Sequence, residues 1–211
     1  MATDIDQSVQ ILQAYPADMA EIFDLQRVAY LSEAQLFNNY AIQPLTQTLE
    51  QALAEFHRFV VFKAVRQERI IGSVRVYESQ NTGYINKLIV QPDCQNQGIG
   101  KRLMQFAESF FAGKRCELFT AARSWKNLAL YKKLGYTVYR EKADATGFVF
   151  AFLAKTIQAL APAIDHPDHK KQKPGGVVFS SVTFPESPEA QFKRLLREKG
   201  GRPRQMEPHA G

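Results

Sequence analysis

Cysteine is scarce in this sequence, which holds only Cys94 and Cys116 among its 211 residues. Two cysteines form neither a disulfide framework nor a zinc-binding set. Long hydrophobic runs are also missing, since the longest, Phe148–Ala154, is far shorter than the ~20 residues of a transmembrane helix. The first ten residues are polar and lack the apolar core of a signal peptide. We therefore expect a cytoplasmic protein of a reducing compartment, with no membrane partner.

The overall composition is that of a folded protein. Hydrophobic residues make up 45% of the chain and aromatic residues 11%, which is too apolar for a disordered protein. There is no collagen period and no heptad array. A chain of 211 residues corresponds to one domain with an extension, or to two small domains. A chain of this length buries roughly 70% of its unfolded surface and can form a core.

The positive charge of the chain is spread over two parts. The total is +6, from 27 basic and 21 acidic residues, which suits an anionic partner such as nucleic acid, a membrane surface or a phosphate-bearing cofactor. Residues 1–161 hold 18 basic and 15 acidic residues, and residues 162–211 hold nine and six. Each part therefore carries +3, and the surplus does not form one patch that would favour nucleic acid.

The composition changes near residue 161. Seven of the ten prolines and three of the four histidines follow it. We interpret residues 162–211 as a flexible, irregular Pro/Gly-rich tail and residues 1–161 as one α/β domain. The pair His166 and His169 has a spacing compatible with a metal, but among prolines it is more typical of a solvated linker, so we expect no metal.

Apolar periodicity predicts alternating strands and helices in residues 1–161. After a first strand near Val9 and Ile11, the expected strands are Phe59–Arg66, Ile70–Tyr77, Tyr84–Val90, Cys116–Arg123, Tyr136–Arg140 and Phe148–Lys155. The expected helices start at Pro16-Ala17-Asp18, span about Thr46–Phe56, span Gly98–Ala112, and run from a Ser124 cap to Gly135.

The most informative segment joins the strand that ends at Val90 to the helix that starts near Gly98. Two glycines, Gly98 and Gly100, let the backbone turn tightly and expose its N–H groups. A helix N-terminus adds unpaired donors and a partial positive charge, so this corner suits a pyrophosphate. The spacing matches neither the P-loop nor the three-glycine dinucleotide fingerprint. Two glycines alone also occur in an ordinary strand–loop–helix corner.

The pattern Gln95-x-x-Gly98-x-Gly100 after an apolar strand resembles the acetyl-CoA-binding motif of the GNAT superfamily of N-acetyltransferases, [R/Q]-x-x-G-x-[G/A]. A second segment, residues 127–136, is similar to the family's helix that bears Asn and Tyr and ends at Leu-Gly-[Phe/Tyr]. Both motifs occur in the family order within residues 8–156. The segments Ser32-Glu33-Ala34, residues 42–48 and residues 117–120 resemble a branch of uncharacterised family members.

The resemblance implies a fold and a reaction. The fold is a mixed sheet of about seven strands flanked by about four helices. The reaction is transfer of an acetyl group from acetyl-CoA to a small-molecule or peptide amine by direct attack on the thioester. The residues implied to bind the cofactor are Leu88, Ile89, Val90, Gln95, Asn96, Gln97, Gly98, Ile99, Gly100, Lys101 and Asn127.

The resemblance also implies a general acid, Tyr131, which would protonate the leaving thiolate. Without the family context, Tyr131 would be a core aromatic residue in the stripe with Leu128 and Leu134. The general base is open, because residues 84–87 contain no carboxylate. Its candidates are Glu33, Glu78 and an ordered water, with Glu33 equally readable as a solvated helix charge.

Other classes of function remain open at this stage. The missing strand carboxylate would also suit a non-catalytic acetyl-CoA-binding module. Basic clusters in the tail, such as Lys170-Lys171, raise nucleic-acid binding, but no such module accompanies them. Cys94 has no partner that would make it a nucleophile, and a homodimer is expected only from the habit of the family.

Overall fold

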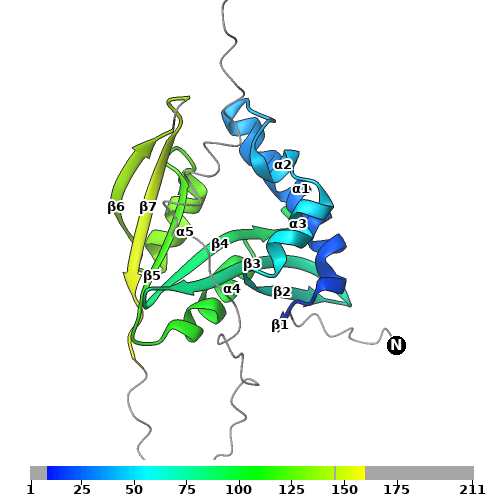
Figure 1. The fold of residues 1–211 in the computed structure, drawn as a ribbon, viewed down its shortest axis with the longest axis horizontal. Helices are drawn as coiled ribbons and strands as arrows, with labels where there is room; N and C mark the ends of the chain where they lie inside the picture. The colour runs from blue at the N-terminus through cyan, green and yellow to red at the C-terminus, as the bar shows by residue number, and fades with distance from the viewer. Residues whose placement is uncertain (1–8, 145, 160–211) are drawn as a thin grey trace, which may run out of the picture.

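The chain forms one mixed sheet with helices on both faces (Figure 1). This computed structural model describes residues 9–144 and 146–159. The predicted α/β fold with about seven strands and about four helices is confirmed, since the sheet has seven strands and one of the five α-helices is a single turn. The predicted tail, residues 162–211, lies outside the described residues.

The sheet has the strand order β1-β2-β3-β4-β5-β7-β6. Strands β4 and β5 are parallel, and the other neighbouring strands are antiparallel. The crossover between β4 and β5 carries a helix, as a parallel connection needs. The strands are β1 Gln10–Gln13, β2 Val60–Arg66, β3 Arg69–Ser79, β4 Thr82–Val90, β5 Arg115–Ala121, β6 Thr137–Ala143 and β7 Val149–Thr156.

The helices divide between the two faces of the sheet. Three of them, α1 to α3, cover one face, and α4 covers the other (Figure 1). No helix in the described ranges is long and apolar enough to cross a bilayer. The bounds are α1 Met19–Phe37, α2 Gln43–Thr46, α3 Leu49–Phe56, α4 Ile99–Glu108 and α5 Trp125–Lys133, with 3₁₀ turns at Pro16–Asp18, Pro92–Cys94 and Ser109–Phe111.

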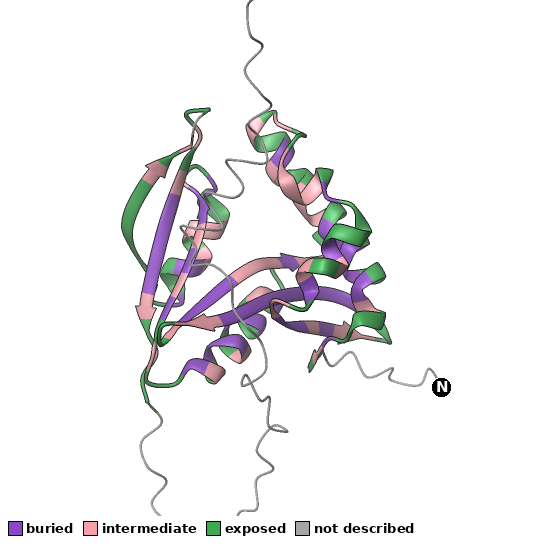
Figure 2. Cartoon of the chain, viewed as in Figure 1, coloured by how far each residue is buried: buried purple, intermediate pink, exposed green. Residues whose placement is uncertain are grey.

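Alternating strand residues face two separate cores. On β2, Val61 packs with α1 and α3, whereas Val60 and Phe62 pack in the core that contains α4 and Tyr131. The central strands are buried on both faces, while the edge strand β6 is largely exposed (Figure 2). This two-sided burial explains the near-continuous apolar runs in the central strands.

The helix predicted over about Thr46–Phe56 is α3, but it begins three residues later than predicted, after Thr48. The separate single turn α2 precedes it and ends at Thr46. Thr48 and Gln51 form a capping box, in which Thr48 Oγ1 accepts from the Gln51 N–H at 3.2 Å and Gln51 Oε1 accepts from the Thr48 N–H at 3.0 Å. This box sets the start of α3.

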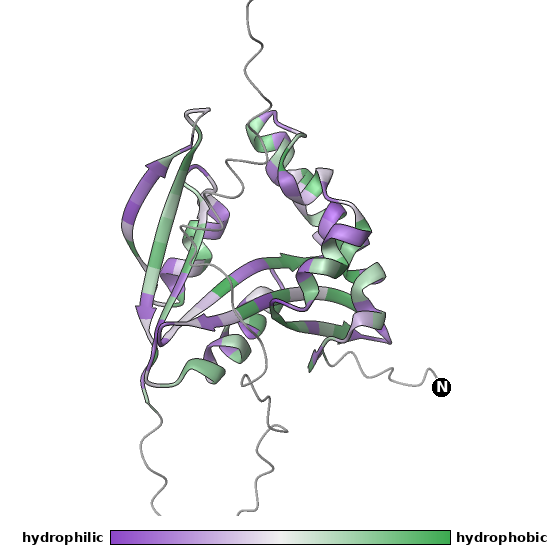
Figure 3. Ribbon diagram, viewed as in Figure 1, coloured by the Kyte–Doolittle hydropathy of each residue, from purple (hydrophilic) through white to green (hydrophobic). Residues whose placement is uncertain are grey.

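Strand β4 contains a bulge and then separates from β5. Register shifts between Ser73, which lies opposite Ile89, and Arg75, which lies opposite Asn86, and Lys87 takes a left-handed conformation with φ 46°. Strand β4 changes here from hydrophilic to apolar (Figure 3). It pairs with β5 only over Thr82–Tyr84 within the described ranges, and the two strands then diverge (Figure 1). The divergence opens the middle of the sheet.

We expect Gly83→Ala to destabilise the fold, because Gly83 lies in the short stretch where β4 and β5 still pair. A Cβ atom at Gly83 would overlap the fully buried ring of Phe111. Overpacking of this kind costs about 1–3 kcal/mol. Urea denaturation should show a lower midpoint for Gly83→Ala. The control is Gly100→Ala, whose Cβ has ordinary contacts, and equal midpoints for the two variants would contradict the role of Gly83.

Candidate active site

Two hydrogen bonds hold the loop between β4 and α4 against the sheet. The Gln91 N–H donates to the Ile71 carbonyl at 2.9 Å, and Gln95 Nε2 donates to the Val90 carbonyl at 3.2 Å. Asn96, with φ 61°, and Gly98, with φ 80°, make left-handed turns that lead into the helix. Gly98 is the residue before α4, so the two turns aim the N-terminus of this helix at the end of β4.

The geometry of the loop fits a phosphate-bearing cofactor. A Cβ at Gly98 would meet no atom within 4 Å, so the space beside it is open. The first N–H groups of α4 have no acceptor inside the helix, as at every helix start. A Cβ at Gly100 would lie 3.6 to 3.9 Å from Leu130, Val90 and Leu88. Gly100 therefore faces side chains of β4 and α5.

Each residue expected in the cofactor loop has a definite environment. Ile99 is a core residue, 2% exposed, that anchors α4, and Lys101 is exposed. Gln97 Oε1 accepts from Arg66 Nη2 at 2.8 Å, while Gln97 Nε2 donates to the Asp93 carbonyl at 3.1 Å. Arg66 therefore adds a cation beside the loop. It is distant in sequence and gave no signal in the motif.

Two neighbours of the loop, Arg102 and Cys94, are engaged in other ways. Arg102, in the first turn of α4, donates from Nη2 to the Val9 carbonyl at 2.6 Å and links α4 to the residue before β1. Burial, helped by Asp93, raises the pKa of the Cys94 thiol, against the opposing effect of Arg66. A thiol that stays protonated is a poor nucleophile, which agrees with the expectation for Cys94.

The strand segment expected beside the thioester, Leu88–Val90, lies where β4 has already separated from β5. Leu88 and Val90 pack toward the α4 core, and Ile89, 5% exposed, packs toward α1 and α3. Among the described residues, the edge of Leu88–Val90 that faces β5 has no strand partner. This edge is thus available to backbone hydrogen bonds from another molecule.

Glu33 on α1 and Asn127 on α5, which were predicted separately, are in contact across the gap where β4 and β5 have separated. Glu33 Oε1 accepts from Asn127 Nδ2 at 3.2 Å and from Ser124 Oγ at 2.7 Å. Ser124 is the N-cap residue of α5, as predicted, but its hydroxyl donates to Glu33 and makes no capping hydrogen bond with the helix. Asn127 Nδ2 also lies 3.4 Å from Thr120 Oγ1 on β5. Glu33 thereby links α1 to α5.

Tyr131 lies one helical turn after Asn127 and is 8% exposed. Burial raises the pKa of its hydroxyl, and both Tyr30 and Glu33 raise it further. Burial also raises the pKa of Tyr30 to about 12, with Arg75 opposing and Glu33 adding to the shift. Tyr131, Tyr30 and Glu33 therefore form one electrostatic group. Sequence reasoning did not identify Tyr30 as a site residue, because it lies among the apolar positions of α1 and resembles a core residue.

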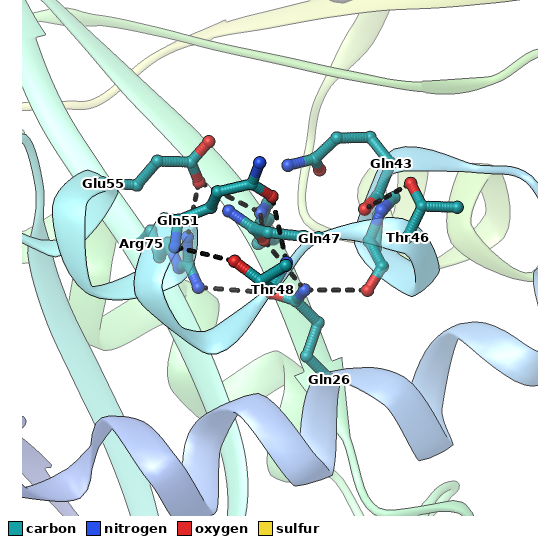
Figure 4. Close-up of polar contacts among 10 residues, drawn as sticks. Gln26, Gln43, Thr46, Gln47, Thr48, Gln51, Glu55 and Arg75 are labelled. Carbon is teal, nitrogen blue, oxygen red and sulfur yellow. Dashed lines mark hydrogen bonds and ion pairs between the residues drawn. The ribbon is translucent and has the colours of Figure 1, made fainter.

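A second polar cluster lies under α2 and α3 (Figure 4). Arg75, 1% exposed, donates to Glu55 Oε2 at 3.3 Å and to Gln26 Oε1 at 3.2 Å. Lys87 Nζ donates to the same Glu55 oxygen at 3.3 Å and to Gln47 Oε1 at 3.0 Å. Burial pushes the pKa of Glu55 up, but Lys87, Gln47 and Arg75 more than offset it and hold it below its ordinary value.

This cluster brings a carboxylate to the bulge of β4, where the strand's own sequence has none. Glu55 lies on α3, so sequence reasoning had no local signal for it. Glu78, the other base candidate, pairs with Lys114 beside Gly83, before the strands diverge. Among the described residues, no group of three or more potential ligands is placed to hold a metal ion.

The family follows from comparison with known proteins. The model of the Acetyltransferase (GNAT) family matches residues 19–136, which is more than half of the chain, and the chain belongs to this family. It is also similar to UPF0157 protein YqkA of Bacillus subtilis, with 26% identity over 145 residues, which are 68% of this chain and 42% of that protein. The chain thus corresponds to about two fifths of the length of that relative.

Solved structures share the fold at low identity. One is the PaiA N-acetyltransferase of Thermoplasma acidophilum in complex with coenzyme A, with a TM-score of 0.58, 19% identity, and 71% of this chain and 99% of that chain covered. Another is the ribosomal-protein-S18-alanine N-acetyltransferase of Escherichia coli, with a TM-score of 0.60, 15% identity, and coverage of 75% and 99%. They show the same fold, and the family as a whole uses acetyl-CoA.

We expect Gly100→Leu to weaken coenzyme A binding about tenfold or more, which is ~1.4 kcal/mol. The longer side chain would need space beside Leu88, Val90 and Leu130, next to the strand edge expected to bind the cofactor. Isothermal titration with coenzyme A measures the effect. Gly100→Ala is the control and should bind like the unchanged protein, because its Cβ has ordinary contacts. Equal affinity of Gly100→Leu would show that coenzyme A does not bind beside Gly100.

Proposed function

We propose that this protein transfers an acetyl group from acetyl-CoA to a primary amine. The observation that carries the proposal is the unpaired edge of Leu88–Val90, which leads into the loop before the N-terminus of α4. Glu33, which contacts Asn127 one helical turn before Tyr131, supplies a carboxylate. The family match supports an acetyltransferase in general terms. The residues named below add the mechanism.

The cofactor would be held by the loop and the strand edge. The N–H groups from Gln95 to Lys101, at the start of α4, would bind the pyrophosphate, with Arg66 adding positive charge. Coenzyme A supplies the activated acetyl group as a thioester. The free edge of Leu88–Val90 would bind the pantetheine arm and place a backbone N–H at the developing oxyanion.

The chemistry needs two proton movements. An alkylammonium has a pKa near ~10, so it must lose a proton before its nitrogen attacks the carbonyl carbon. Glu33 is our candidate to attract this ammonium and to pass its proton to solvent. As the C–S bond breaks, Tyr131 would donate its hydroxyl proton to the leaving thiolate. Asn127 and Ser124 would hold the Glu33 carboxylate in place.

A thiol-release assay with acetyl-CoA and a panel of amines tests the reaction. Turnover on at least one amine is the expected result. Thermal stabilisation by coenzyme A without turnover on any amine would instead indicate a module that binds the cofactor without catalysis.

We expect Tyr131→Phe to lower kcat by about 10²–10⁴, the usual contribution of a general acid. The KM for acetyl-CoA should change little, because the hydroxyl acts on the leaving group. Steady-state kinetics give both constants. Tyr139→Phe, at an exposed position on β6, is the matched control and should keep full kcat. A normal kcat for Tyr131→Phe would assign the tyrosine to the core alone.

The pH profile of kcat/KM should show no fall caused by deprotonation of Tyr131 below about pH 10. Tyr131 works in its protonated form, and its raised pKa keeps that form present until the pH exceeds the folded value. Because deprotonation of the amine favours attack, kcat/KM should rise with pH and then level off. A fall with an apparent pKa at or below 10, in protein whose circular dichroism is unchanged, would contradict this assignment.

A further inference from the structure

A polar hollow of about 640 Å³ lies between α2 and α3, and its size suits a small molecule. It presents three amides, a hydroxyl, a carboxylate and a guanidinium, which belong to Gln43, Gln47, Gln51, Thr46, Glu55 and Arg58. All of these except Arg58 are labelled in Figure 4. The remaining lining residue is Ala54, so among the described residues no aromatic or large apolar side chain borders the hollow. A ligand of this hollow must be held by hydrogen bonds and charge.

The hollow adjoins the reacting centre. Two of its lining residues, Gln47 and Glu55, also contact Lys87 at the bulge of β4, which directly precedes Leu88. Helices α2 and α3 cover the face of the sheet opposite α4, whose N-terminus forms the cofactor loop (Figure 1). A ligand in the hollow would therefore approach the diverging strands from the face opposite the cofactor. Transfer between two substrates requires such an arrangement.

Two charged residues line the hollow, Glu55 and Arg58. The Glu55 carboxylate lies within 3.3 Å of both Arg75 and Lys87, so its charge is already matched. Arg58, three residues after Glu55, is then the charge that a ligand of the hollow would meet, and it favours a ligand with an anionic group over a polyamine.

Helix α1 connects the hollow to Glu33. Gln26 donates from Nε2 to Gln47 Oε1 at 3.2 Å, and Tyr30 and Glu33 follow Gln26 at i+4 and i+7 on α1, which places the three on one side of the helix. Glu33 contacts Asn127, one helical turn before Tyr131. A molecule that extends from the hollow along this side of α1 would pass from the Arg58 guanidinium to the Glu33 carboxylate.

We propose that the hollow binds the acceptor and selects a small amine that also carries a carboxylate, as a free amino acid does. Arg58 would pair with the carboxylate, the glutamine amides and Thr46 would bind the polar remainder, and the amine would face Glu33 and Tyr131. The assignment rests on the proposed acetyl transfer and adds the class of its acceptor.

The test compares amino acids with their carboxamides, in which a neutral amide replaces the carboxylate. The amine of the carboxamide is also less basic, which by itself favours the carboxamide and so cannot produce a preference for the amino acid. With acetyl-CoA as donor, kcat/KM for the favoured amino acids should exceed that for the matching carboxamides about tenfold or more, a ratio equivalent to ~1.4 kcal/mol. Arg58→Gln should reduce the ratio toward one by lowering kcat/KM for the amino acids more than for the carboxamides. Arg58→Lys should keep part of the preference. Arg27→Gln, an exposed position on α1, is the control and should keep all of it.

Binding provides a readout that does not need turnover. In the presence of saturating coenzyme A, isothermal titration with the same amino acids should show binding that Arg58→Gln weakens and Arg27→Gln does not. Turnover with equal rates for amino acids and carboxamides would overturn the acceptor class and leave acetyl transfer standing. Arg58-dependent binding without turnover would support the hollow and contradict the reaction. Neither preference nor Arg58-dependent binding would overturn the inference.

Discussion

The separation of β5 from β4 is the constraint on which the rest of the structure depends. A parallel pair is stable only where both strands keep their ladder, and here the ladder stops after Tyr84. The bulge at Lys87 turns β4 away, and Phe111 fills the space that a side chain at Gly83 would need. The unpaired edge of Leu88–Val90 could otherwise pair with strands of other chains. A bound molecule that pairs with it turns the same edge into a site.

The two halves of the sheet then need other contacts to fix their relative position. Glu33 reaches from α1 to Ser124 and Asn127 at the start of α5. The rings of Phe37 and Phe148 meet edge-to-face, with centroids 4.8 Å apart. Both contacts span the gap between the separated ends of β4 and β5, away from Thr82–Tyr84, where the two strands pair. Glu33, our proposed catalytic carboxylate, is therefore also a link between the two halves of the sheet, and its two donors limit how far its carboxylate can move.

The sequence predicted those features that depend on neighbouring residues. Gly98 marked the turn before α4, and the spacing of Asn127 and Tyr131 placed both on one side of α5. Features that depend on distant residues were not predictable. Gln26 is a polar residue among the apolar positions of α1, and it is fully buried because Arg75, 49 residues away in the sequence, requires an acceptor there.

Glu33 and Glu55 show how position gives similar side chains different roles. Glu55 shares one oxygen between Arg75 and Lys87, two cations that hold its charge in a buried place, and α1, α3 and β4 are joined through this cluster. Burying such a group is costly unless its partners remain in place, so the cluster is best suited to fixing geometry. Glu33 is bound by neutral donors, which orient its carboxylate without cancelling its charge. Its negative charge thus remains available to an incoming ammonium, whereas that of Glu55 is already matched.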